Sequence, residues 1–200
     1  MPADILKDAE LYGEPPTAVF VGEWMMTYTG RRFYVFDPDP KLICIEDIAH
    51  HLAMECRYGG AVRRYYSVAE HSVYVSHLVA PELALEGLLH DAAEAYISDM
   101  IRPIKHHPKM RIVCETEAQI QAAVWERFGI NYSSENERAV KIVDDRIVLD
   151  EVDALLPDPG AYRTRHSGAP FGIDIVGYSP EYAEAAFLCR WYELQREAAR

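Results

Sequence analysis

The chain has 200 residues, half of them hydrophobic, which is enough for one globular domain over 1–200 with a sizeable core. Its formal net charge of -12 repels polyanions, so a large nucleic-acid-binding surface is disfavoured. The sequence has no apolar run long enough for a membrane span and no secretion signal with a basic and then an apolar region. Its four cysteines form no CxxC pair. We therefore expect a cytoplasmic protein with reduced thiols and no membrane span.

The N-terminal part of the chain is predicted to be irregular at first and then to form a hairpin. Residues 1–23 contain a Pro-Pro breaker and show no periodicity. Stretches rich in aromatic and β-branched residues flank Gly30, which predicts a hairpin over about 24–37. Apolar residues then recur at helical spacing, which predicts a helix over 45–56.

Two helices with recognisable start signals follow. Ser67 and Glu70 match the S-x-x-E capping box, which predicts a helix that carries His71 in its second turn. Pro81 ends this helix and suits the first turn of the next one. A leucine-rich pattern then indicates one continuous helix over about 83–96.

Turn and capping residues divide the rest of the chain into four predicted helices and one loop. The predicted helices span 99–104, 110–128, 136–156 and about 180–197. Gly129 closes the second, Ser134 caps the third, and Ser179-Pro180 begins the fourth. The Pro- and Gly-rich residues 157–178 are predicted to form a loop. The sequence therefore predicts a mainly α domain.

Two histidines and two aspartates in three of these predicted helices form a candidate metal-ligand set. They are His71, the doublet His90-Asp91, and Asp144. Taken alone, each is more often a solvated polar residue of an amphipathic helix than a ligand. Together they offer the mixed nitrogen and oxygen donors that Mn, Fe, Co, Ni or Zn prefer, and such a metal can activate water and polarise a phosphoryl oxygen.

The residues around this set resemble the motifs of the HD-domain phosphohydrolases. The stretches SVAEHS at 67–72 and LLHDAAEAYISD at 88–99 are similar to the first two motifs, and VKIVD at 140–144 with Glu151 is similar to the third. The resemblance covers about residues 45–156 and implies an all-α HD-domain helical bundle with a small N-terminal β-hairpin. The pattern looks most like bacterial 5′-deoxynucleotidases and phage dATP triphosphohydrolases, and the hairpin sequence Thr-Tyr-Thr-Gly favours the phage proteins.

The resemblance implies a role for each matching residue. The implied metal ligands are His71, His90, Asp91 and Asp144. Asp144 is preferred to its neighbour Asp145 because the family pattern places the ligand after Val-Lys-x-x. The implied acid/base pair is Glu94 and Asp99, and a helix N-cap is the alternative role for Asp99. The implied substrate-binding residues are Arg57, Tyr58, Pro103, Lys105 and Lys141.

The resemblance implies a metal-dependent hydrolase of deoxynucleotides, with dATP and other dNTPs as expected substrates and metal-activated water as the nucleophile. The alternatives are a 5′-deoxynucleotidase that accepts only monophosphates and a non-catalytic helical interaction module stabilised by a metal. The expected cofactor is Co, Mn, Zn, Fe or Ni, with Mg as an optional addition. We expect a homo-oligomer, either a dimer or a hexamer, with no nucleic-acid polymer or membrane as partner. The pairs His50-His51 and His106-His107 lie outside the motifs and are not expected to be ligands.

Overall fold

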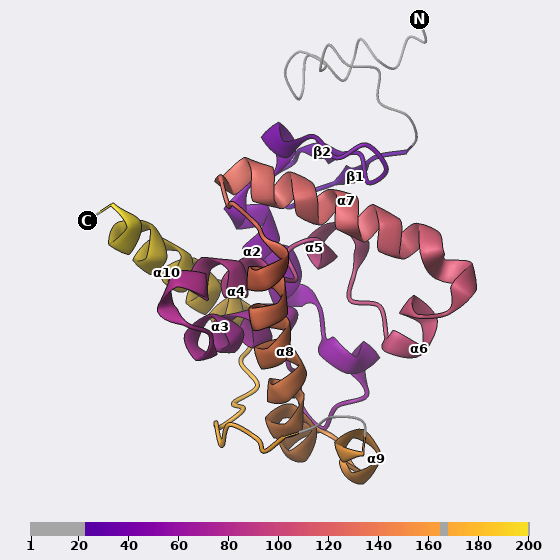
Figure 1. The fold of residues 1–200 in the computed structure, drawn as a ribbon. Helices are drawn as coiled ribbons and strands as arrows, with labels where there is room; N and C mark the ends of the chain where they lie inside the picture. The colour runs from indigo at the N-terminus through magenta and orange to yellow at the C-terminus, as the bar shows by residue number, and fades with distance from the viewer. Residues whose placement is uncertain (1–22, 165–167, 200) are drawn as a thin grey trace, which may run out of the picture.

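The computed structural model describes residues 23–164 and 168–199, and Figure 1 shows a mostly helical chain with one small sheet near its N-terminus. The predicted irregular segment 1–23 lies outside the described residues except for its last residue. Strands β1 (Met25–Met26) and β2 (Arg32–Phe33) pair antiparallel. The predicted hairpin is therefore confirmed, although its strands are shorter than expected because the chain turns again directly after β2.

The hairpin is fixed to the helices by one buried carboxylate. Asp47 has no exposed surface and accepts hydrogen bonds from the backbone N–H of Thr29 at 2.7 Å, its hydroxyl at 2.9 Å and the Cys44 thiol at 3.0 Å. Burial alone would raise the pKa of Asp47, but these hydrogen bonds outweigh it and lower the pKa. A buried acid in the first turn of α2 (Ile45–Met54) thus holds the tip of the hairpin.

Asp47→Ala is expected to lower the free energy of unfolding by about 1–3 kcal/mol, because it leaves buried donors without an acceptor. Chemical denaturation measures this loss, and amide hydrogen exchange of residues 25–33 should accelerate. The neighbouring Glu46 is exposed, so Glu46→Ala is the matched control and should unfold like the wild type. Equal stability of the two variants would contradict the role given to Asp47.

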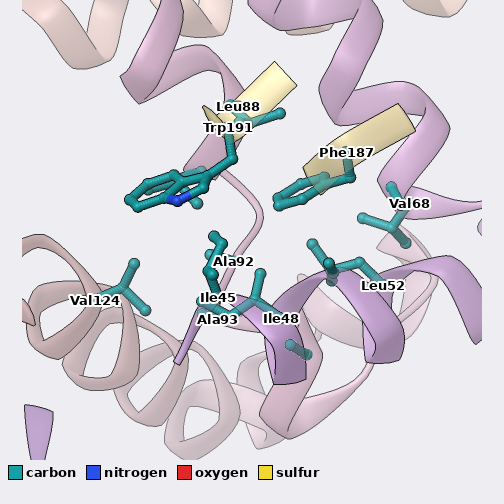
Figure 2. Packing of buried hydrophobic residues seen from close by; sticks show 14 of the residues in the cluster. Ile45, Ile48, Leu52, Val68, Leu88, Ala92, Ala93, Val124, Phe187 and Trp191 are labelled. Atoms are coloured by element: carbon teal, nitrogen blue, oxygen red, sulfur yellow. The ribbon is translucent and has the colours of Figure 1, made fainter. Parts of the chain in front are cut away.

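The main core lies where the C-terminal helix crosses the helices of the first half of the chain. Helix α10 (Pro180–Ala198) packs against α2, α3 (Val68–Leu78) and α4 (Ala84–Leu89). Figure 2 shows its Phe187 and Trp191 side chains over the apolar residues of these helices. Burial of each such large side chain stabilises the fold by roughly 1.5–3 kcal/mol. The residues labelled around them are Ile45, Ile48, Leu52, Val68, Leu88, Ala92, Ala93 and Val124.

Capping residues in the sequence predicted the C-terminal end of α7 (Arg111–Phe128) and the N-terminal end of α10. Helix α7 ends at Gly129, which has a left-handed φ of +66°, and α10 begins after the N-cap Ser179. Helix α8 (Ser134–Leu155) is capped by Ser133, so the predicted cap at Ser134 was wrong by one residue. The short helices are α5 (Glu94–Ile97), α6 (Arg102–Lys105) and α9 (Gly160–Arg163), and the 3-10 turns are η1 (Pro40–Leu42), η2 (Arg57–Gly60), η3 (Pro81–Leu83) and η4 (Pro108–Met110).

The continuous helix predicted over 83–96 is wrong, because the chain leaves the α-helix after Leu89. The backbone N–H of Ala92 bonds to Leu89, and that of Glu94 bonds to Asp91, three residues back instead of four. This tightened stretch separates α4 from α5. The His90-Asp91 doublet therefore lies in a turn between two short helices.

The predicted loop 157–178 contains α9 and a final segment that two acids hold in place. Asp150 of α8 accepts the backbone N–H groups of Phe171, Gly172 and Ile173 at 2.7–3.0 Å. Glu70 of α3 accepts those of Gly177 and Tyr178. The predicted capping box is therefore only partly confirmed. The Ser67 hydroxyl caps α3, but the Glu70 carboxylate binds the distant loop.

Among the described helices, none has the length and hydropathy needed to cross a bilayer.

Candidate metal centre

Three separate elements bring His71, His90 and Asp144 together. His71 comes from α3, His90 from the turn after α4, and Asp144 from α8. The Nε2 atom of His71 lies 3.1 Å from Asp144 Oδ1 and 3.3 Å from His90 Nε2. One ligand atom from each residue lies within 4.8 Å of the others, so this group could hold a metal ion.

The other predicted ligand, Asp91, joins the same cluster. Its Oδ2 atom lies 3.2 Å from His90 Nε2 and 3.7 Å from His71 Nε2. The neighbouring acid Asp145 is different, because its carboxylate contacts Lys141 at 2.6 Å and Arg102 at 3.8 Å on a more exposed surface. The side chain of Asp144 is 16% exposed, whereas that of Asp145 is 45% exposed.

The two histidines share one hydrogen-bonding arrangement. His90 Nδ1 donates to the carbonyl oxygen of Gly87 at 2.9 Å, and a carbonyl can only accept, so Nδ1 carries the proton. His71 Nδ1 lies 2.6 Å from the Glu151 carboxylate and donates to it. Both Nε2 atoms then face the carboxylates of the cluster, that of His71 near Asp144 and that of His90 near Asp91. Each Nε2 can offer a lone pair to a metal once it carries no proton. The Nδ1 contacts are the usual way in which an outer partner orients a metal-binding histidine.

The sequence motifs assign no role to Glu151, whose carboxylate contacts the candidate ligand His71. It is fully buried and also accepts the hydroxyls of Tyr58 at 2.5 Å and Tyr66 at 2.8 Å. Burial alone would raise its pKa, but the Arg57 and His71 charges outweigh burial and hold the pKa of Glu151 at about 2. Its position seven residues after Asp144 was the available signal, because two helical turns place both on one side of α8.

Glu94 and Asp99 lie close to the cluster and have unusual environments. Glu94 is 5% exposed, Lys105 Nζ lies 3.5 Å from its Oε1 atom, and its Oε2 atom has no hydrogen-bond partner among the residues that the structure describes. Burial and the nearby Asp91 and Asp99 charges raise the pKa of Glu94. Burial also raises the pKa of Asp99. Asp99 does not cap a helix, since α6 begins after Ile101.

The predicted phosphate-binding cations all contact acids. The Arg57 guanidinium lies 3.4 Å from Asp91 and 3.6 Å from Glu151. The ammonium groups of the two lysines make similar pairs: Lys105 with Glu117 at 2.7 Å, and Lys141 with Asp144 at 2.7 Å. The Tyr58 hydroxyl binds Glu151, and Pro103 lies in the first turn of α6. The three cations thus border the cluster, each bound to a carboxylate.

The donor atoms of this site fit a divalent cation. Two imidazole nitrogens and the carboxylates of Asp91 and Asp144 lie together there. Despite burial, the acids around His90 raise its pKa to about 10. A metal would compete with that proton, and imidazole with carboxylate oxygen suits a first-row transition metal.

The histidine pairs outside the motifs do not join this cluster. His50 Nδ1 contacts Glu184 at 2.9 Å, and His51 Nδ1 donates to the carbonyl oxygen of Ala95. His107 accepts the backbone N–H of Lys109 in the turn η4.

Comparison with known proteins identifies the family. No family model matches the sequence. The uncharacterized protein YfdR of Escherichia coli K12 is 32% identical over 174 residues, which cover 86% of this chain and 95% of YfdR. The chain belongs to the YfdR family. An uncharacterized protein of Rhodobacter capsulatus is 35% identical, with 86% of this chain and 96% of that protein aligned. Neither relative's name states an activity.

Proposed function

We propose that the protein is a metal-dependent phosphohydrolase of the HD-domain superfamily that acts on deoxynucleotides, with dATP and other dNTPs as substrates. The observation that carries the proposal is the convergence of His71, His90 and Asp144, with the Asp91 carboxylate beside both histidines. The Nδ1 atoms of both imidazoles are bound elsewhere, so Nε2 is the nitrogen that faces the cluster. This shared orientation supports the proposal, because metal-binding histidines usually hold an outer partner on their other ring nitrogen.

The residues beside the cluster supply proton transfer. When bound, a divalent transition metal supplies positive charge that acidifies water and polarises a phosphoryl oxygen. Asp99 accepts the proton of the attacking water, and Glu94 delivers a proton to the leaving oxygen. The buried, unpartnered Oε2 of Glu94 favours this assignment, because a neutral carboxyl group can donate there.

The cations bind the phosphate chain of the substrate. Arg57 is held by Asp91 and Glu151 beside the cluster, and its planar guanidinium suits two phosphate oxygens at once. Lys105 and Lys141 act as point charges on either side. Each cation exchanges part of its contact with an acid for a contact with phosphate when the substrate enters.

Purified protein stripped of metal with a chelator should release no phosphate, and Co, Mn or Zn should restore release from dATP. Each dNTP and dNMP is tested with each metal and with Mg, and chromatography identifies the products. Phosphate release from monophosphates alone would support a 5′-deoxynucleotidase instead. Metal binding without turnover of any nucleotide would contradict the enzyme proposal and favour a metal-stabilised interaction module.

A further inference from the structure

A second candidate binding site lies between the hairpin and the helices. It is an open groove of about 420 Å³, a volume that falls within the rough 300–1,000 Å³ range of small-molecule sites. Its walls come from β1 and the hairpin turn, the end of α2, and the end of α5. The lining residues are Met25, Met26, Thr27, Tyr28, His50, His51, Met54, Glu55, Ala95, Tyr96 and Ser98.

The chemistry of this groove suits a flat, uncharged ring. Tyr28 stacks on His50 with ring centroids 3.6 Å apart and planes 9° apart, yet the tyrosine is 59% exposed. Met26 and Met54 are also exposed, and their sulfur atoms pack well against aromatic rings. Among the described lining residues there is no lysine or arginine, so the groove offers no charge for a phosphate.

One carboxylate gives the groove a means of polar recognition. Glu55 accepts the backbone N–H of Asp99 through Oε2 at 2.8 Å. A carboxylate has about four lone-pair positions, so Glu55 can accept further N–H groups from a ligand. Stacking against an aromatic wall beside an acceptor for N–H groups is the combination that recognises a nucleobase with an exocyclic amine.

The groove is also connected to the candidate catalytic acid. Ser98, which lines it, has a φ of +73°, a left-handed backbone conformation that non-glycine residues seldom adopt. The next residue is Asp99, whose backbone N–H donates a hydrogen bond to the Glu55 carboxylate. A ligand that contacts Glu55 therefore contacts the group that positions the backbone of Asp99.

We propose that this groove binds the heterocyclic base of an adenine nucleoside, stacked against Tyr28 and hydrogen-bonded to Glu55. The choice of adenine and of a nucleoside rests on the proposed function, whereas the flat, uncharged and amine-bearing character of the ligand rests on the groove alone. The base of the substrate and a separate effector nucleoside offer the same chemistry. The experiment below distinguishes these two sources.

Deoxyadenosine, which has no phosphate, is titrated into the full-length, metal-free protein by calorimetry. Saturable binding is expected, and Tyr28→Ala should raise the dissociation constant about five-fold or more, since stacking on an aromatic residue is typically worth that much. The bond from Tyr28 to His51 uses the backbone N–H and survives this change. Met54→Ala, at an exposed wall residue, should also weaken binding.

One control variant separates the groove from the rest of the molecule. Tyr192→Ala removes a similarly exposed tyrosine from α10 and should bind deoxyadenosine like the wild type. The absence of saturable binding, or wild-type affinity in both Tyr28→Ala and Met54→Ala, would overturn the proposal.

Steady-state hydrolysis of dATP with added deoxyadenosine identifies the source of the base. A raised KM at constant kcat assigns the groove to the base of the substrate, and a changed kcat assigns it to an effector. If the wild type hydrolyses no nucleotide but still binds deoxyadenosine through Tyr28, the proposed function fails and the groove proposal stands.

Discussion

Asp144→Asn is expected to lower metal-dependent phosphate release at least about 100-fold, since even the loss of an outer partner of a metal ligand costs 10–100-fold. The amide keeps the shape of the side chain but loses the negative charge that lies 3.1 Å from His71 Nε2. Metal content, measured after dialysis against a limiting metal concentration, should fall together with activity.

The adjacent Asp145 supplies the matched control, because it is the same residue type one position further along α8. Its carboxylate contacts Lys141 and Arg102 near the surface, and an exposed ion pair contributes little. Asp145→Asn should therefore keep the rate within about five-fold and retain full metal content. Equal losses in the two variants would show that Asp144 has no special place in the centre.

Glu151→Ala is expected to have the largest effect on stability, lowering the free energy of unfolding by about 3–5 kcal/mol. It removes one of the two carboxylates beside the buried Arg57 charge, and it removes the acceptor of His71, Tyr58 and Tyr66. Urea denaturation of the metal-free protein measures the loss. Asp153→Ala, an exposed acid two residues later in α8, should cost about 1 kcal/mol or less. A similar cost in both variants would refute the buried role of Glu151.

The stabilisation by Glu151 should depend on pH in a defined direction. Its folded pKa of about 2 is depressed below the ordinary value, so the carboxylate contributes fully above about pH 4.5. That contribution is lost as the pH falls through the folded value. The stability difference between the wild type and Glu151→Ala should therefore narrow between about pH 4.5 and pH 2, as thermal unfolding at several pH values will test.

The helix ends that local chemistry determines could be predicted from the sequence. Gly129 and Ser179 fixed their boundaries because a left-handed C-terminal residue and a hydroxyl cap act within a few residues. The break after Leu89 could not be predicted, because Gly87, the glycine of this leucine pattern, lies inside α4 and the helical pattern continues past it. At this break the backbone N–H groups bond to carbonyl oxygens three residues back, and this depends on where tertiary packing places the His90-Asp91 doublet.

The meeting of His71, His90 and Asp144 could be predicted from the sequence motifs, but the surrounding contacts between charged groups could not. The buried position of Glu151 and the acid partners of Lys105 depend on contacts between residues far apart in sequence. Glu70 shows the same limit, since its carboxylate binds backbone groups more than 100 residues away instead of its own helix end.

Asp150 and Glu151, adjacent in α8, have separate tasks. Glu151 orients His71, while Asp150 holds the backbone at 171–173, and the segment continues through Tyr178 into α10. A rotation of α8 would disturb both sets of contacts together. If the candidate centre holds a metal, we expect its binding and the ordering of residues 171–178 to be thermodynamically linked, so that loss of the contacts to Asp150 would weaken metal binding by the same free energy with which the metal orders the segment.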